Sequence, residues 1–260
     1  MPLYIEVLIK ASLDDLWHRT QDPACHQRWD ARFTRITYLP SVETGSDGNE
    51  GPTPPADGAA RSHGQPTDGA EVPRLATRFG YATRVFPGQT ISGSGITINE
   101  RLRDDGTRTS ALRFSSPDRR SPIRRGTGYW RYIPTASGVR FLTGYQYTPG
   151  WGWFGRPADL LVRPLLGWAT AWSFDRLRLW SERGISPRRA LVHAWCEIIA
   201  RFAVITVAAA LDKPLAMLAS ILAIAIPPTP WTPAARRCLR TPPDNAAGRA
   251  PAIATTLEDR

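Results

Sequence analysis

The chain has few of the residues that carry metal and redox chemistry. Only three cysteines and four histidines occur among its 260 residues. Cys25, Cys196 and Cys238 stand alone, with no CxxC pair and no histidine at the spacing of a metal ligand. We therefore expect neither a disulfide framework nor a zinc site, and isolated thiols favour a reducing, cytoplasmic compartment.

The sequence also lacks the common motifs of catalysis. Gly93-Ser94-Gly95 misses the third glycine of a dinucleotide fingerprint, and no GxxxxGK[ST], HExxH or GxSxG is present. His18 and His26 fall on expected helices, where a surface or core position is a simpler interpretation than a general base. We expect no cofactor and no metal, and the sequence leaves open whether any reaction is catalysed.

Lysine is almost absent, although the chain is strongly basic. Lys10 and Lys213 are the only lysines among 33 basic residues, and the formal net charge is +10. Such an arginine bias reflects either the base composition of a genome or an anionic partner such as a membrane surface. Nucleic acid is not the expected partner.

The N-terminal residues lack the basic start and apolar stretch of a signal peptide. Residues 4–9 are instead rich in strand formers, and Ser12 with Asp15 fits a capping box that starts a helix. Asp22 followed by Pro23 starts a second short helix, because the carboxylate can cap and proline suits the first helical position. A strand followed by two short helices is therefore expected.

The middle of the chain predicts an antiparallel sheet interrupted by one insertion. Residues 41–73 consist mainly of Gly, Pro, Asp, Ala, Ser and Thr, so we expect a disordered loop there. Residues 74–86 alternate with period two, with Phe79 and Tyr81 on the same face. Further strands are expected at 89–100, 107–115, 125–134 and 138–148.

A long helix is expected from residue 157 to Gly184. Its apolar residues follow steps of three and four, typical of a helix that buries one face. They include Leu161, Leu165, Trp168 and Trp172. Gly184 ends the helix, and Pro187 prevents its continuation.

The order of these elements resembles the helix-grip (SRPBCC) superfamily. That superfamily includes START lipid-transfer domains, bacterial polyketide cyclases and aromatases, and plant Bet v 1-type proteins. The resemblance rests on the first strand, the two small helices, the stretch from Asp22-Pro23 to Arg28-Trp29-Asp30, the strands and the final helix. It covers residues 1–185 and implies an α+β fold, in which a curved antiparallel sheet wraps around a long C-terminal helix and encloses a ligand cavity.

Aromatic side chains on the inner faces are the candidates for lining such a cavity, because sparse polar groups on apolar walls are typical of small-molecule pockets. The candidate ligand-binding residues are Trp29, Phe79, Tyr81, Tyr129, Phe141, Tyr145, Trp168 and Trp172. For each of them an ordinary closed core is the alternative. Over 125–134 the inward face is either Tyr129 with Arg131 or Trp130 with Tyr132.

An apolar helical hairpin is expected over 186–226, broken at Asp212-Lys213-Pro214. Its first arm carries Glu197 and Arg201, a possible i,i+4 pair, and its second arm is too short to span a bilayer. The hairpin is therefore expected to be an interfacial or re-entrant membrane anchor with its flanking arginines at anionic headgroups, or alternatively to pack on the domain or on a second copy of the chain. Residues 227–260 are rich in proline and are expected to form a disordered tail.

The sequence thus favours binding or transport of a hydrophobic small molecule or lipid at the inner face of a membrane. A polyketide cyclase or aromatase, using pocket residues such as Arg78, Arg131, Tyr81 or Tyr145, is one alternative. A membrane-associated assembly or coenzyme-chaperone protein is another. The ligand and the oligomeric state, including a possible homodimer, stay open.

Overall fold

The computed structural model describes residues 3–39, 76–86, 88–100 and 105–251. The disordered loop expected over 41–73 lies outside the described residues. The expected strands and helices that fall within them are present within about two residues of the positions that periodicity and capping indicated.

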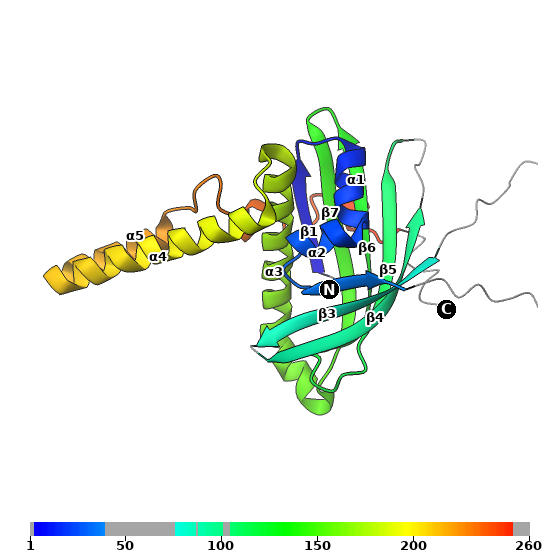
Figure 1. Ribbon diagram of the computed structural model, residues 1–260, viewed down its shortest axis with the longest axis horizontal. Helices are drawn as coiled ribbons and strands as arrows, with labels where there is room; N and C mark the ends of the chain where they lie inside the picture. The colour runs from blue at the N-terminus through cyan, green and yellow to red at the C-terminus, as the bar shows by residue number, and fades with distance from the viewer. Residues whose placement is uncertain (1–2, 40–75, 87, 101–104, 252–260) are drawn as a thin grey trace, which may run out of the picture.

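One seven-stranded antiparallel sheet forms the body of the protein (Figure 1). The strands are β1 (Leu3–Ile9), β2 (Arg35–Tyr38), β3 (Ala76–Phe86), β4 (Gln89–Glu100), β5 (Arg108–Ser115), β6 (Ile123–Thr135) and β7 (Gly138–Pro149). Their order in the sheet is β1-β7-β6-β5-β4-β3-β2. Strands β3 to β7 therefore form a meander, and the first strand, β1, pairs with the last, β7. The sheet curves around the helices on one of its faces.

Three helices cover the inner face of this sheet. Helix α1 (Leu13–Gln21) begins where the Ser12 hydroxyl accepts a hydrogen bond from the Asp15 amide at 3.2 Å. Helix α2 (Pro23–Trp29) is capped by Asp22, and the long helix α3 (Gly155–Arg183) ends at Gly184 with a positive φ of 64°. The fold is therefore the expected α+β helix-grip architecture.

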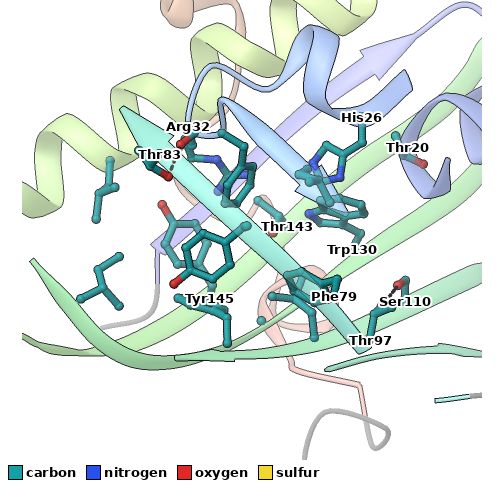
Figure 2. A pocket seen from close by; sticks show the side chains of 18 of the residues that line it. Thr20, His26, Arg32, Phe79, Thr83, Thr97, Ser110, Trp130, Thr143 and Tyr145 are labelled. Atoms are coloured by element: carbon teal, nitrogen blue, oxygen red, sulfur yellow. Dashed lines mark hydrogen bonds between the residues drawn. The ribbon is translucent and has the colours of Figure 1, made fainter. Parts of the chain in front are cut away.

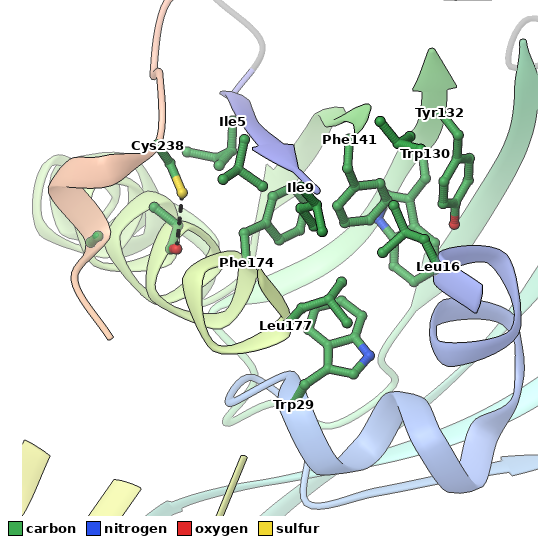
Figure 3. Packing of buried hydrophobic residues seen from close by; sticks show 14 residues of the cluster. Ile5, Ile9, Leu16, Trp29, Trp130, Tyr132, Phe141, Phe174, Leu177 and Cys238 are labelled. Carbon is green, nitrogen blue, oxygen red and sulfur yellow. Dashed lines mark hydrogen bonds between the residues drawn. The ribbon is translucent and has the colours of Figure 1, made fainter. Parts of the chain in front are cut away.

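The core lies between α3 and the strands β1, β6 and β7 (Figure 3). Phe174 of α3 stacks on Phe141 of β7, with ring centroids 4.5 Å apart. Trp29 of α2 meets both rings edge-on and is completely buried. This aromatic cluster fixes α2 and α3 against the sheet, because large buried rings contribute most of the apolar area of a core.

The hairpin consists of α4 (Pro187–Leu211) and α5 (Lys213–Ala225). It projects from the C-terminal end of α3, away from the sheet (Figure 1). Helix α4 contacts α2 and α3 where it begins, at the buried Pro187 and Ala190. Only 6% of its most apolar 18-residue stretch is buried, so most of the hairpin does not pack on the domain. Glu197 and Arg201 form an ion pair, and Arg201 also donates to the carbonyl oxygens of Ala223 and Ile226 at the end of α5.

The chain after the hairpin corrects one expectation from the sequence. Residues 228–251, here called the strap, are not a disordered tail but lie against α3 and β1, with a short 3₁₀ helix (Ala235–Arg237) and helix α6 (Asn245–Gly248). Leu239 exchanges two backbone hydrogen bonds of 2.9 Å with Glu6 of β1. The buried carboxylate of Asp175 accepts from the Ala234 amide and from Arg237. Specific polar contacts thus order a segment whose proline-rich composition suggested disorder.

Candidate functional site

A cavity of about 180 Å³ lies between α1, α2, α3 and strands β2 to β7 (Figure 2). This volume exceeds the ~150 Å³ at which an apolar cavity is known to bind benzene. Most of its walls are apolar, and the apolar lining residues include Phe33, Phe79, Ile91, Phe114, Trp130 and Leu166. The cavity has the composition of a small-molecule site.

Strand alternation and glycines in the neighbouring strands place the aromatic rings. Phe79 and Tyr81 of β3 pair across the ladder with Gly95 and Gly93 of β4. A Cβ atom at either glycine would overlap the ring of its partner, so each ring lies over a strand that has no side chain there. The Gly93-Ser94-Gly95 stretch therefore makes room for cavity walls and has no relation to a nucleotide fingerprint.

One end of the cavity holds a buried ion pair. Arg32, just after α2, donates from Nε to Asp30 Oδ1 at 2.9 Å and from Nη2 to Asp30 Oδ2 at 2.6 Å. The Asp30 side chain has no exposed surface, whereas that of Arg32 keeps 16% and lines the cavity. His26 Nε2 lies 3.1 Å from the same carboxylate and its ring stacks on Trp29.

The ion pair determines the charge states at this end. Burial alone would raise the pKa of Asp30, but the Arg32 guanidinium and the hydrogen bond from His26 outweigh it and hold that pKa well below its usual range. Burial likewise lowers the pKa of Arg32, yet the Asp30 carboxylate outweighs this effect and the pKa is raised. The pair is therefore ionised at neutral pH and has no net charge.

Weaker polar groups line the remaining walls. Thr97 and Ser110 lie 3.2 Å apart across β4 and β5. The Tyr145 hydroxyl lies 3.1 Å from the Thr170 hydroxyl of α3. Tyr81 donates to the Ser115 carbonyl at 3.4 Å, and burial raises the pKa of its phenol to about 12. These hydroxyl groups can hold a ligand by hydrogen bonds.

Three of the eight residues expected to bind a ligand line the cavity. These residues are Phe79, Tyr81 and Tyr145. Trp29 and Phe141 belong instead to the closed core and are fully buried. The periodicity of the sequence could not separate cavity-lining residues from core residues, because both point inward. Inward side chains next to α3 are covered by that helix, and those farther along the sheet are not.

Tyr129 lies on the opposite face of the sheet, where it packs with Tyr4 and Leu142. The inward residues of β6 are Trp130 and Tyr132, the other alternative that the sequence allowed. The expectation of Tyr129 in the cavity was therefore wrong, because neighbouring residues of a strand point to opposite faces.

Trp168 and Trp172 of α3 do not line the cavity. Trp168 is 51% exposed and stacks on the half-buried Trp172, with ring centroids 6.1 Å apart. Leu166 is the α3 residue that lines the cavity. The Thr170 hydroxyl of α3 forms a hydrogen bond with the hydroxyl of Tyr145, another lining residue. Trp172 packs at the edge of the core, whereas Trp168 is exposed, so neither tryptophan reaches the cavity.

Sequence reasoning missed the polar end of the cavity. Asp30 and Arg32 follow α2 directly, and His26 comes four residues before Asp30. A histidine and an acid at i,i+4 with an arginine two residues later is a signal that could have been noticed.

Of the arginines considered for a cyclase, Arg78 is exposed and Arg131 donates to the Arg249 carbonyl, so neither lines the cavity.

Two other groups of residues lie outside the cavity wall. Trp151, Trp153 and Phe154 are exposed around the 3₁₀ helix Gly152–Phe154, and none lines the cavity. At the turn between α1 and α2, donor atoms of His18, Asp22 and Cys25 come within 4.8 Å of one another. This group is partly exposed, and Asp22 already caps α2.

The sequence matches no protein-family profile. It is 42% identical over 190 residues to the uncharacterized membrane protein YndG of Bacillus subtilis (strain 168), an alignment that covers 72% of this chain. The chain spans about 60% of the length of that relative.

Solved structures with some likeness include the STAR-related lipid transfer protein of Xanthomonas axonopodis, at 18% identity, 60% coverage of this chain, 74% of that one and a TM-score of 0.40. The di-domain ARO/CYC StfQ of the steffimycin biosynthetic pathway has 14% identity, 70% coverage of this chain, 51% of that one and a TM-score of 0.43.

Proposed function

We propose that the protein binds a hydrophobic small molecule or lipid in the cavity between sheet and α3, and that the α4–α5 hairpin holds it at a membrane. The observation that carries the proposal is the pairing of a mostly apolar cavity with an exposed apolar hairpin on the same chain. A ligand with low solubility in water is taken up most readily where it is dissolved, in a bilayer.

The apolar surface of the hairpin supports membrane contact. Phe202, Val207, Met217 and Ile224 are each more than 60% exposed. Exposed apolar patches of this kind mark protein or membrane interaction sites. Helix α4 is also long and apolar enough to cross a membrane, by length and composition only.

The position of the polar residues favours insertion into one leaflet. Glu197 and Arg201 lie where α5 ends, and Glu197 also accepts from the Thr229 amide of the strap. Beyond Arg201 the α4 helix has ten more residues, a rise of about 15 Å. Half of a hydrocarbon core about 30 Å thick has the same depth.

This placement puts Asp212 and Lys213, at the tip, near the bilayer centre. An ionised side chain there costs about 2.5–3.5 kcal/mol. Full burial of each large apolar side chain contributes about 1.5–3 kcal/mol. The exposed apolar residues of the inserted part are Phe202, Val204, Val207, Leu211, Leu215, Met217, Leu218, Ile221, Leu222, Ile224 and Ile226. Their transfer outweighs the two charges even when half of their surface is already covered.

One observation supports the inner face of a membrane, and a second supports a membrane location in general. Arg188 and Arg189 are exposed at the start of α4, and arginines beside a membrane segment favour the anionic cytoplasmic leaflet. The relative from Bacillus subtilis is itself named a membrane protein.

The membrane part of the proposal is tested by flotation with vesicles that contain anionic lipid. The wild-type chain should float, and the double variant Phe202→Asp/Ile221→Asp should stay at the bottom of the gradient. Its matched control, Leu160→Asp/Leu161→Asp, changes two residues of α3 that are 79% and 73% exposed but lie at the end of α3 away from the hairpin, so it should float.

Flotation of the hairpin variant as efficiently as the wild type would contradict the membrane role. Wild-type protein that ignores vesicles and forms a dimer in light scattering would assign the hairpin to a second copy of the chain.

A further inference from the structure

We infer that the ligand carries one uncharged hydrogen-bond-accepting oxygen, of the carbonyl type, on an otherwise apolar body, and that Arg32 binds this oxygen. The inference rests on the proposed ligand-binding function and adds the chemical class of the ligand. It is carried by the way Arg32 is held at one end of the cavity (Figure 2).

The guanidinium of Arg32 is fixed before any ligand arrives. Asp30 takes up its Nε and one N–H of Nη2. Its central carbon lies 5.4 Å from the ring centroid of Phe33 and 5.9 Å from that of Tyr145. Tyr145 is a further hydrogen-bond partner of the guanidinium. An arginine has five N–H donors and no acceptor, so the N–H groups of Arg32 beyond those that Asp30 and Tyr145 take up can only donate. A bound group must therefore accept hydrogen bonds.

The charge of the ion pair selects against an anion. Among the lining residues that the structure describes, Arg32 alone carries a permanent charge, and the fully buried Asp30 balances it. An anionic ligand would lose its hydration without meeting a net positive charge, and such a transfer is costly in an apolar cavity. A carbonyl oxygen accepts the same hydrogen bonds without that loss.

The remaining walls limit the ligand to one such group at this end. Thr83 donates to the Arg32 carbonyl at 2.8 Å, and Thr143 donates to the Tyr129 carbonyl at 2.9 Å, so both hydroxyl hydrogens are already used. Phe79 and Trp130 lie on other sides of the cavity (Figure 2). The body that follows the oxygen must be mostly apolar to match these rings, and the hydroxyls of Thr97, Ser110 and Tyr145 are the polar groups that it can meet elsewhere.

Three naphthalene probes of similar size separate the possibilities: 2-acetylnaphthalene, 2-ethylnaphthalene and 2-naphthoate. Their binding to the full chain in lipid nanodiscs is measured by calorimetry, with empty nanodiscs as the reference. The ketone should bind about tenfold more tightly than the ethyl compound, because a hydrogen bond from a charged donor is worth about that factor. It should also bind more tightly than the naphthoate.

Removal of Arg32 alone would leave Asp30 buried without a partner, so the test variant is Asp30→Asn/Arg32→Met, which neutralises both residues and leaves no hydrogen-bond donor at position 32. In this variant the preference for the ketone should fall to about twofold or less, with the affinity for 2-ethylnaphthalene unchanged. Circular dichroism and the melting temperature check that the variant is folded.

The outcomes separate the two proposals. Equal binding of the ketone and the ethyl compound to the wild type would overturn the inference and leave the ligand-binding function in place. Tighter binding of the naphthoate would also overturn it. Failure of all three probes to bind would count against the ligand-binding function itself.

Discussion

At the scale of single residues, the cavity depends on positions that have no side chain. Tyr81 and Phe79 lie over Gly93 and Gly95 of the adjacent strand, so their rings can lie along the sheet and form a wall. Phe114 lies over Gly126 in the same way. These glycines are needed for space, since none of the three has a positive φ.

The substitution Gly93→Ala should therefore disturb the cavity wall. Its Cβ would overlap both the Tyr81 ring and the Ser115 carbonyl oxygen, and a crowded core site of this kind costs about 1–3 kcal/mol. The matched control is Gly80→Ala on β3, where a new Cβ meets nothing within 4 Å. Urea denaturation should show a lower free energy of unfolding for Gly93→Ala only. Equal stability of the two variants would show that the Tyr81 ring moves without cost.

The Asp30–Arg32 pair makes stability depend on pH. The native pKa of Asp30 is well below the value of about 3.9 expected in the unfolded chain. When the pH falls below that unfolded value, the unfolded chain takes up a proton that native Asp30 does not, so the contribution of Asp30 is present above it and is lost on acidification. Asp30→Asn should thus be strongly destabilising at neutral pH, by about 3–5 kcal/mol, because Arg32 is left without its partner.

This prediction is checked by the free energy of unfolding at pH 7 and pH 3. The difference between wild type and Asp30→Asn should shrink at pH 3. Asp15→Asn is the control, because Asp15 pairs with Arg19 at the surface, where such a pair is worth about 1 kcal/mol or less. A difference that is the same at both pH values would mean that Asp30 has an ordinary pKa.

Local signals in the sequence were sufficient for the helix ends and the strands. Ser12, Asp22 and Gly184 act as the caps that their residue types indicate. The site was less predictable, because an inward side chain in a closed core and one on a cavity wall have the same pattern. Phe141 and Tyr145 are four residues apart on one strand, yet the first is covered by α3 and the second faces the cavity.

At the scale of elements, the strap is the segment whose structure was predicted least well from its amino-acid composition. Its proline content indicated disorder, but the ordering contacts come from α3, more than fifty residues earlier in the chain. Asp175 has no exposed surface, and it binds Arg178 on its own helix as well as Arg237. Contacts between distant segments leave no periodic trace in a sequence, so the strap could not be predicted from local pattern.

Loss of Arg237 should loosen the strap. Arg237→Ala removes the ion pair to Asp175 and the hydrogen bonds to the carbonyl oxygens of Pro228, Thr229 and Thr232. We expect a cost of about 3 kcal/mol, because one partner of a buried pair is removed. Arg236→Ala is the matched control, since Arg236 is exposed. Hydrogen exchange should be faster in the strap of the Arg237 variant alone, and unchanged exchange would show that the backbone contacts to β1 suffice.

At the scale of the whole molecule, the hairpin would determine how the protein is oriented relative to a membrane. It leaves the C-terminal end of α3 and points away from the sheet, so membrane insertion would place the cavity on one side of the bilayer (Figure 1). The exposed Arg188 and Arg189 mark the end of the hairpin that would stay with the headgroups. The sequence indicated the hairpin correctly, because long apolar helices are the strongest pattern in this chain. The direction in which the hairpin leaves the domain could be seen only in the three-dimensional structure.

Membrane binding should therefore have an electrostatic part and an apolar part that can be separated. Arg188→Glu/Arg189→Glu should weaken binding to anionic vesicles, since each basic residue near such a surface contributes about 1 kcal/mol and the change also adds repulsion. Binding to neutral vesicles should stay as in the wild type, because the apolar faces of α4 and α5 are intact. The control Arg119→Glu/Arg120→Glu has the same charge change on two exposed arginines of the loop between β5 and β6, and it should bind both kinds of vesicle normally. If the control weakens binding as much as the hairpin variant, the net charge of the protein, rather than the arginines beside the hairpin, directs it to the membrane.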